Sequence, residues 1–210
     1  MLITELEITK QLRDQHSLEH IVEKSGWHLL GSGIEATVAE HPNRMYVLKI
    51  WPKTSRYTAF VEFVRDNAAN PHVPRFSRYT RPLPGTNYVY VRMEKLSPIT
   101  ENKLKKTYPA ELLWLFAVGA KNNISSLTGN PWYFASDQML RFGIKVHSNT
   151  DLHKDLEGIW EKFGYPPPAW VEICEKLIAS AKQHGFAGFD LHHENFMRRG
   201  QTLVITDPWF

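Results

Sequence analysis

The amino-acid sequence changes character near residue 97, and this change constrains the fold more than any other feature. Before it, short runs rich in β-branched and aromatic residues alternate with glycine and proline turns, and one helix-like run covers 56–69. After it, helix-like runs dominate before a hairpin closes the chain. These helices are predicted at 108–121, 133–142, 151–163 and 168–184. We therefore expect an α+β fold of two lobes with a cleft between them, residues 1–96 and 97–210.

Strand and turn signals divide the first lobe further. A charged amphipathic helix is predicted over residues 1–25. Two strands flank a glycine turn near residue 32, and a third covers 45–51. Two more strands are predicted at 75–79 and 87–96, joined by a turn that contains proline and glycine. The first lobe should therefore hold an antiparallel sheet, with one helix that follows its third strand in the sequence.

Composition and charge argue against several classes of protein. Hydrophobic residues make up 42% and charged residues 22% of the chain, as in ordinary globular proteins, so a disordered chain is not expected. The net charge of +3 does not call for a nucleic-acid partner. Arg75, Arg78 and Arg81 come close to a basic cluster, but a solvated loop is the favoured interpretation.

Other features bear on the compartment. Glu5 and Glu7 interrupt the N-terminus, so it has no apolar core of signal-peptide length. No run approaches the roughly 18 apolar residues of a membrane span. The single cysteine, Cys174, permits no intramolecular disulfide and predicts a reducing, cytoplasmic location. It shares a helical stripe with Trp170 and Leu177, so we expect a buried packing thiol rather than a nucleophile.

Two motifs in the first lobe suit phosphoryl transfer, in which a protein holds phosphates and a metal and aims the acceptor. Gly31-Ser32-Gly33 lies between two predicted strands, where glycines let the backbone approach phosphates closely. A plain hairpin turn is the alternative. Lys49 lies in the apolar run V-L-K-I, where an unpaired charge is costly unless a phosphate or a carboxylate relieves it. An outward-facing lysine on a half-exposed strand is the alternative.

Two motifs in the second lobe supply the remaining parts. Asp190 precedes Asn195 by five residues, the spacing of a kinase catalytic loop. In such a loop the acid accepts the proton of the acceptor hydroxyl, and the amide oxygen helps to hold magnesium. Asp207 ends a short apolar strand twelve residues after Asn195 (207 − 195), where a kinase has its metal-binding aspartate. Together with ATP, Asn195 and Asp207 would complete a magnesium shell.

Alternatives accompany these two motifs as well. His192, His193 and Glu194 could bind a metal, although adjacent histidines point in different directions. Asp207 could simply begin a turn before Pro208, which is a common arrangement. The order of the four motifs, and their predicted placement on strand, strand, loop and strand, argues against coincidence.

Supporting residues complete the predicted nucleotide site. Glu62, on the helix after Lys49, is a candidate partner for its ammonium group, with simple surface exposure as the alternative. Met93 would face the adenine, and Glu94 to Leu96 would form the hinge; an ordinary edge strand is the alternative there. The predicted nucleotide-binding set is Gly31, Ser32, Gly33, Val38, Lys49, Glu62, Met93, Glu94 and Leu96.

The motifs resemble those of the serine/threonine protein kinases that short-tailed coliphages make early in infection. The similar stretches, within 26–96 and 184–208, are G-W-H-L-L-G-S-G, Y-T-A-F, G-F-D-L-H-H-E-N-F-M and V-I-T-D-P. The resemblance implies a protein-kinase-like bilobal fold that transfers the γ-phosphate of ATP, with Mg²⁺, to host-protein Ser or Thr hydroxyls in the bacterial cytoplasm. Asp190 and Lys49 would be catalytic.

The chain also departs from the kinase pattern. Phe189 replaces the arginine that usually precedes the catalytic aspartate, so control by a phosphorylated activation loop is not expected. After Asp207 come only Pro-Trp-Phe, with no D-F-G, activation segment, A-P-E or later helices. Whatever binds the acceptor would have to come from residues 97–183, which resemble nothing recognisable.

Two other functions remain open at this point. D-L-H-x-x-N more distantly resembles the aminoglycoside-type phosphotransferases. In that case the helical segment would enclose a small acceptor, and Asp137 or Asp151 could bind its amine. The missing C-terminal elements favour a third possibility, a kinase-fold protein that binds ATP or a host partner without turnover. The sequence predicts neither the oligomeric state nor any part in a toxin–antitoxin pair.

Overall fold

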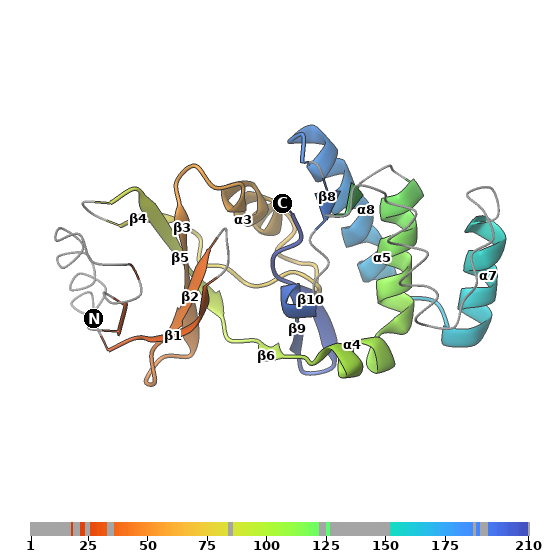
Figure 1. The fold of residues 1–210 in the computed structure, drawn as a ribbon, viewed down its shortest axis with the longest axis horizontal. Coiled ribbons are helices and arrows are strands. Elements are labelled where there is room, and N and C mark those ends of the chain that lie inside the picture. Colours follow the sequence, from red (N-terminus) through yellow and green to blue (C-terminus); the bar gives the residue numbers. More distant parts are fainter. Residues whose placement is uncertain are drawn as a thin grey trace. The chain divides into compact units, whose positions relative to one another are not determined.

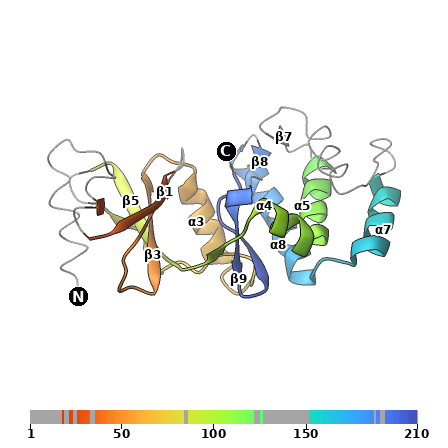
Figure 2. The ribbon, with the colours of Figure 1, turned by 60° about the horizontal axis from the view of Figure 1, so that its bottom comes forward.

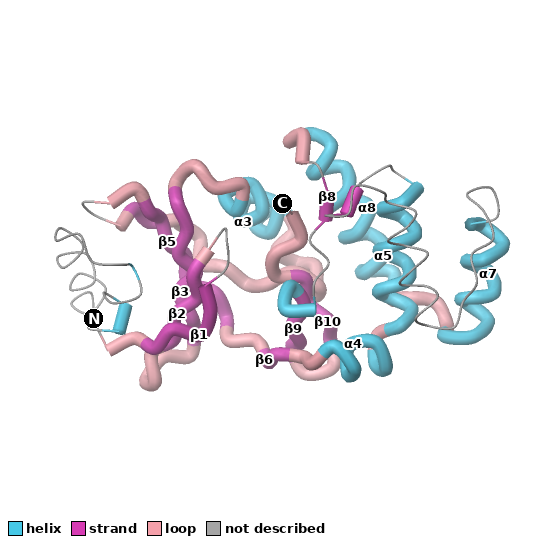
Figure 3. Tube along the Cα trace, in the orientation of Figure 1, coloured by secondary structure: helices cyan, strands magenta, loops and turns pink. Residues whose placement is uncertain are grey.

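The computed structural model describes residues 18, 22–23, 26–32, 36–83, 86–121, 125–126, 152–186, 188–189 and 193–209. These residues form an α+β protein with a five-stranded antiparallel sheet and several helices, so the predicted class is confirmed (Figures 1 and 3). The chain divides into two compact units. The first comprises Met1–Asp66 and Pro74–Lys95, and the second comprises Asn67–Val73 and Leu96–Phe210.

The first unit is built on the five-stranded sheet. Its elements are β1 (His28–Ser32), β2 (Thr37–Glu40), β3 (Tyr46–Pro52), α3 (Tyr57–Asp66), β4 (Arg81–Pro82) and β5 (Tyr88–Glu94). The strand order is β1-β2-β3-β5-β4, and every neighbouring pair is antiparallel. Hairpin-type connections join β1, β2 and β3, as the turn signals predict.

Both faces of the central strand β3 are covered, which explains its unbroken apolar run. On one face, Leu48 and Ile50 pack into an apolar cluster whose members also come from β2 and β5. On the other face lies α3 (Figure 2), where Trp51 Nε1 donates to Thr58 Oγ1 at 3.0 Å. The five central residues of β3 are consequently buried. A strand buried on both faces needs apolar side chains at successive positions rather than alternate ones.

The strand predicted at 75–79 is wrong. Within it, Phe76 forms only an isolated bridge with Met93, and the strand that pairs with β5 on the side away from β3 is the two-residue β4. The backbone N–H of Arg92 donates to the Ser77 hydroxyl at 3.2 Å instead of to a carbonyl. A side chain that takes a ladder hydrogen bond ends regular pairing, and the chain leaves the sheet there.

The second unit is mainly helical, with short strands. Its elements are β6 (Ser97–Pro98), α4 (Glu101–Thr107), α5 (Pro109–Lys121), β7 (Ser125–Ser126), α7 (Leu152–Phe163), α8 (Pro168–Gln183), β8 (Gly188–Phe189), η1 (His193–Asn195), β9 (Phe196–Arg199) and β10 (Thr202–Ile205). The helices predicted at 108–121, 151–163 and 168–184 are confirmed as α5, α7 and α8. The predicted hairpin around Gly200 is confirmed as β9–β10.

Some sequence predictions differ from the structure or lie beyond what it describes. The predicted helix at 133–142 lies outside the described residues, as does most of the predicted helix at 1–25. The predicted boundary follows residue 96, whereas Leu96 and the segment 67–73 belong to the second unit. The two-residue strands β6, β7 and β8 were not predicted, because two residues carry no detectable periodicity.

The core of the second unit forms where α5 contacts both α7 and α8 (Figure 1). Cys174 on α8 is completely buried, and burial raises the pKa of its thiol well above the ordinary value. The expected packing thiol is therefore confirmed, because a neutral buried thiol is a poor nucleophile. In the part of the chain that the structure describes, no helix has the length and apolarity needed to cross a membrane.

Candidate functional site

The sheet of the first unit places three of the predicted nucleotide-site residues in one row. Gly31 on β1 pairs with Val38 on β2, and Val38 pairs in turn with Lys49 on β3. The register between β1 and β2 shifts between Leu29 and Gly31, so a bulge precedes the glycine. Paired residues of an antiparallel sheet project to the same face, which places Val38 and Lys49 side by side.

Lys49 is buried on the face of the sheet that α3 covers. Only 8% of its surface is exposed, and its Nζ lies 4.6 Å from the centroid of the Tyr57 ring. The alternative of an outward-facing lysine is therefore wrong. An aromatic face attracts an ammonium group, although more weakly than a phosphate or carboxylate does. Tyr57 thus holds the end of Lys49 beside α3.

The other residues of the first unit that were predicted to bind nucleotide differ in their burial and in their contacts. Glu62 is exposed on α3, where its charge acts on Arg65, and its pairing with Lys49 stays a prediction. Met93 is buried on β5 opposite Val47. Glu94 accepts a 2.7 Å hydrogen bond at Oε1 from the backbone N–H of Arg75. The Ser32 side chain and Gly33 lie outside what is described.

The second unit brings its two predicted magnesium ligands onto neighbouring strand ends. Asn195 closes η1 directly before β9, and Asp207 follows β10 by two residues. Phe196 and Ile205 are paired in the ladder. Beyond that pair, Thr206 donates to the Asn195 carbonyl both from its backbone N–H at 2.9 Å and from Oγ1 at 3.0 Å. These two bonds fix the backbone of Asn195 against the residue that precedes Asp207.

The remaining predicted catalytic positions fall beyond this description. Asp190 and His192 lie outside the described residues, as do Asp137 and Asp151. Leu96 is half-buried and belongs to the second unit. A search of the described residues for three or more His, Cys, Asp or Glu side chains that could share a metal finds none. The alternative metal site at His192, His193 and Glu194 includes His192 and therefore lies partly outside the described residues.

The segment 67–73 supports the β9–β10 hairpin within the second unit. The backbone carbonyl of His72 accepts a hydrogen bond from the backbone N–H of Ile205 at 2.9 Å. The ring nitrogen Nδ1 of the same residue lies 2.8 Å from the Leu203 carbonyl oxygen. From β9, Arg199 donates to the carbonyls of Pro71 and Val73 at 2.8 and 3.0 Å. The strand that leads to Asp207 is thus held along both edges.

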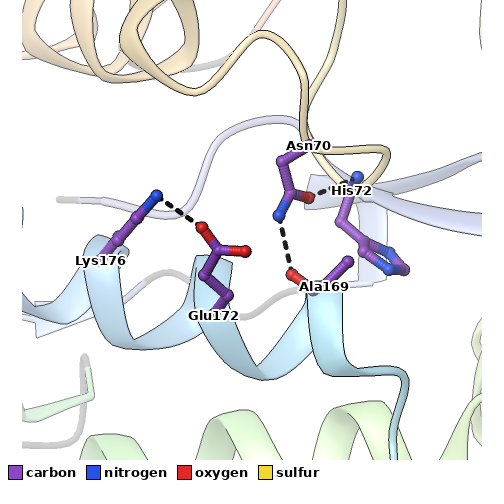
Figure 4. Close-up of polar contacts among 5 residues, drawn as sticks. All are labelled: Asn70, His72, Ala169, Glu172 and Lys176. Atoms are coloured by element: carbon purple, nitrogen blue, oxygen red, sulfur yellow. Dashed lines mark hydrogen bonds and ion pairs between the residues drawn. The ribbon is translucent and has the colours of Figure 1, made fainter.

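The same segment is also fixed to α8. Figure 4 shows how Asn70 of this segment makes the connection. Its Nδ2 donates to the Ala169 carbonyl of α8 at 2.8 Å, and its Oδ1 accepts from the backbone N–H of His72 at 2.9 Å. The His72 ring meets the edge of the Trp170 ring at a centroid distance of 5.1 Å. Asn70 and His72 therefore couple the hairpin to the start of a core helix.

His72 should make the stability of this region depend on pH. Desolvation by burial is the main reason that its pKa is lowered from 6.5; the positive Arg199 also lowers it, while the bond to Leu203 opposes the change. Below pH 6.5 the unfolded chain takes up a proton at this position that the folded chain refuses. The contribution of His72 to stability is therefore present above pH 6.5 and is lost as the pH falls toward its lower folded pKa.

We expect His72→Phe to lower the free energy of unfolding by about 1–3 kcal/mol at pH 7.5, because the Leu203 carbonyl loses its donor. At pH 5.5 the difference from the wild type should shrink, since the wild type has by then lost part of its advantage. Urea unfolding at both pH values measures this. His28→Phe, at an exposed position of β1, should keep the wild-type pH dependence; the same dependence in His72→Phe would contradict the prediction.

Three residues that support these sites were not predicted from the sequence. Tyr57 lies under Lys49, Thr206 clamps Asn195, and His72 holds β10. Thr206 directly precedes Asp207 in the I-T-D-P stretch, and this position next to the expected metal ligand could have indicated a supporting role for Thr206. Tyr57 and His72 act through tertiary contacts, which no local sequence pattern predicts.

Comparison with known proteins adds no further assignment. No protein-family model matches this chain, and no curated protein matches it. The functional argument consequently depends on the residues and their geometry.

Proposed function

We propose that this chain is an ATP- and Mg²⁺-dependent serine/threonine protein kinase with a kinase-like bilobal fold. It would be encoded by a phage or prophage and would act on host proteins in the bacterial cytoplasm. The observation that carries the proposal is the pairing of Asn195 with the Thr206–Asp207 segment at the open end of the β9–β10 hairpin. An amide and a carboxylate on adjacent strand ends, five and seventeen residues after an aspartate (195 − 190 and 207 − 190), match the kinase arrangement.

The donor set of Asn195 and Asp207 fits magnesium. Magnesium prefers hard oxygen ligands and takes one or two carboxylates together with substrate phosphates. Asp207 offers a carboxylate and Asn195 an amide oxygen, and the Thr206 clamp fixes the spacing of their backbones. When bound, the metal neutralises charge on the phosphates. Gly200, with φ of 61°, makes the turn that sets the register of this hairpin.

Lys49 is the proposed contact to the α- and β-phosphates. It lies buried in the row with Gly31 and Val38, so only β2 separates the strand of Lys49 from the strand of Gly31. A buried ammonium group is costly unless it meets an anion. The proposed role for Lys49 is to supply fixed positive charge, and for Gly31 to let the backbone approach the phosphates.

Asp190 is the proposed general base. In this role it accepts the proton of the Ser or Thr hydroxyl as that oxygen attacks the γ-phosphorus, and ADP leaves. Its support is the sequence spacing to Asn195. Little covalent chemistry is required of the protein, because positioning and charge stabilisation provide most of the rate enhancement in phosphoryl transfer.

The experiment that tests this function is transfer of γ-labelled phosphate in a bacterial lysate. The purified chain is incubated with labelled ATP, Mg²⁺ and lysate protein, and the label is identified after acid hydrolysis. We expect phosphoserine and phosphothreonine, and we expect removal of Mg²⁺ with EDTA to reduce the label to background. Mass spectrometry of cells that express the chain or its Asp190→Ala variant then gives the acceptor sites.

Three results would contradict the proposal. Label that persists equally in the Asp190→Ala variant would remove the proposed base. Label that appears only on members of an aminoglycoside or sugar panel would indicate a small-molecule phosphotransferase. Nucleotide binding without any transfer would indicate a kinase-fold protein that only binds.

A further inference from the structure

A hollow opens beside β5 in the first unit, where the chain leaves the sheet and returns. Residues 75–77 run along β5, with Ser77 N–H donating to the Arg92 carbonyl at 2.8 Å, and the chain rejoins β5 where Arg81 pairs with Tyr90. Between these points the loop of residues 77–81 bows away. The hollow has a volume of about 50 Å³ and is lined by residues 77–79, Arg81 and residues 90–92.

The lining is strongly cationic. Three of its seven residues are arginines, Arg78, Arg81 and Arg92, and none is acidic. The remaining polar groups are the hydroxyls of Ser77 and two tyrosines. The carboxylate of Glu94 on the same strand is bound to the backbone N–H of Arg75. A concavity lined by three arginines, with no acidic residue in its wall, is an arrangement that favours an anion.

The loop that carries two of these arginines is fixed by hydrogen bonds. From α3, Arg65 Nη2 donates to the Ser77 carbonyl at 3.2 Å and to Thr80 Oγ1 at 3.0 Å. The Ser77 hydroxyl in turn donates to the Tyr79 carbonyl at 3.3 Å. Because the loop is already ordered, a ligand has less conformational entropy to overcome on binding.

The aromatic neighbours of two arginines orient them as well. The guanidinium carbon of Arg78 lies 5.2 Å from the centroid of the Tyr79 ring, and that of Arg92 lies 5.0 Å from the Tyr46 ring. Cation–π attraction to a ring limits the rotamer freedom of an arginine and helps to fix the direction of its guanidinium group. Arg78 and Arg81 are both exposed at the mouth of the hollow.

The size of the hollow and the modest net charge of the chain limit which kinds of ligand could bind there. A volume of about 50 Å³ is far below the range of pockets that enclose a drug-sized molecule, so only a small group would enter, with the rest of its carrier outside. A nucleic acid would need a basic track along its backbone, whereas the chain carries a net charge of only +3 and the arginines gather at one concavity.

We propose that this hollow, the arginine hollow, binds the phosphate group of a phosphoserine or phosphothreonine in a protein segment. Arg78 and Arg81 would form bidentate bonds at its mouth, and Arg92 would supply charge from β5. Clusters of arginines are the usual means by which proteins recognise phosphorylated residues. All residues that line the hollow belong to the described part of the first unit, and binding there does not depend on the proposed phosphoryl transfer.

The test measures fluorescence anisotropy of the full chain, without ATP, with a labelled peptide of alanine and glycine that contains one phosphoserine. At 0.15 M salt we expect saturable binding, with the matching serine peptide at least about tenfold weaker. Arg78→Gln combined with Arg81→Gln should weaken phosphopeptide binding about tenfold, since two charge-assisted contacts are lost. Both side chains are exposed, so circular dichroism should show an unchanged fold.

A matched control separates the hollow from general charge. Lys53→Gln combined with Lys103→Gln removes the same charge from exposed positions outside the hollow and should leave binding unchanged. Equal weakening by both double variants, equal binding of the serine peptide, or no binding at all would overturn the proposal. Tighter binding of a ten-nucleotide thymidine strand would indicate a nucleic-acid surface instead. Binding of inorganic phosphate but not of the phosphopeptide would rule out a protein segment as the occupant.

Discussion

Under the proposed function, Asp207→Asn is expected to slow transfer of the γ-phosphate by roughly 10²–10³-fold, the loss typical when one preorganised electrostatic contact is removed from a transition state. Asparagine has nearly the same shape as aspartate and keeps an oxygen for the metal, but it lacks the negative charge that holds magnesium most strongly. The rate is measured as initial velocity over a range of Mg²⁺ concentrations. Because the defect concerns metal binding, excess Mg²⁺ should restore part of the activity.

Asp66→Asn provides the matched control for this prediction. Asp66 is an exposed aspartate at the end of α3, so its replacement removes the same charge without touching the β9–β10 hairpin. We expect it to retain wild-type transfer and the wild-type response to Mg²⁺. Thermal unfolding of both variants should stay close to the wild type. Wild-type transfer by Asp207→Asn at low Mg²⁺ would show that this carboxylate is not the metal ligand.

The sequence predicted the elements whose pattern of apolar residues matches the faces that they bury. The apolar run around Lys49 identified β3 and the burial of the lysine, since a strand with helix on one face and an apolar cluster on the other has little room for polar residues. The stripe that contains Cys174 likewise identified α8 and its buried face. In both cases the local pattern and the tertiary environment agree.

Prediction failed where a side chain overrides the backbone pattern. The run at 75–79 alternates like a strand, but the Ser77 hydroxyl takes the hydrogen bond of Arg92 and ends the ladder. The helix predicted at 56–69 extends into the segment 67–73, whereas α3 ends at Asp66. The place of this segment in the second unit depends on Asn70 bonding to Ala169, 99 residues further along the chain. Such long-range polar contacts leave no periodic trace in the sequence.

The candidate site shows the same division. The spacing of Asn195 and Asp207 around Gly200 predicted two oxygen donors at the ends of one hairpin, because a hairpin returns the chain to its starting point. The Thr206 clamp that fixes them could not be derived, since it joins a side chain to a carbonyl across the hairpin. The ring contact of Lys49 was equally hidden, because nothing in the local sequence predicts that Tyr57 lies against its ammonium group.

Trp170 is the residue whose loss should harm the second unit most. It is fully buried in the first turn of α8, and its indole Nε1 donates to the Glu111 carbonyl of α5 at 2.8 Å. It also meets the ring of His72, which holds β10. One side chain thus connects two core helices with the segment that supports the hairpin bearing Asp207.

Trp170→Ala should lower the free energy of unfolding by about 3–5 kcal/mol, because it leaves a large cavity and removes the donor of the Glu111 carbonyl. Chemical unfolding measures the loss, and amide hydrogen exchange should place it in α5 and α8. Trp170→Phe keeps most of the apolar volume and the ring contact, so it should lose distinctly less. Tyr165→Ala removes an aromatic side chain that is 77% exposed and should change stability little. A loss below about 1 kcal/mol in Trp170→Ala would show that the second unit does not depend on this junction.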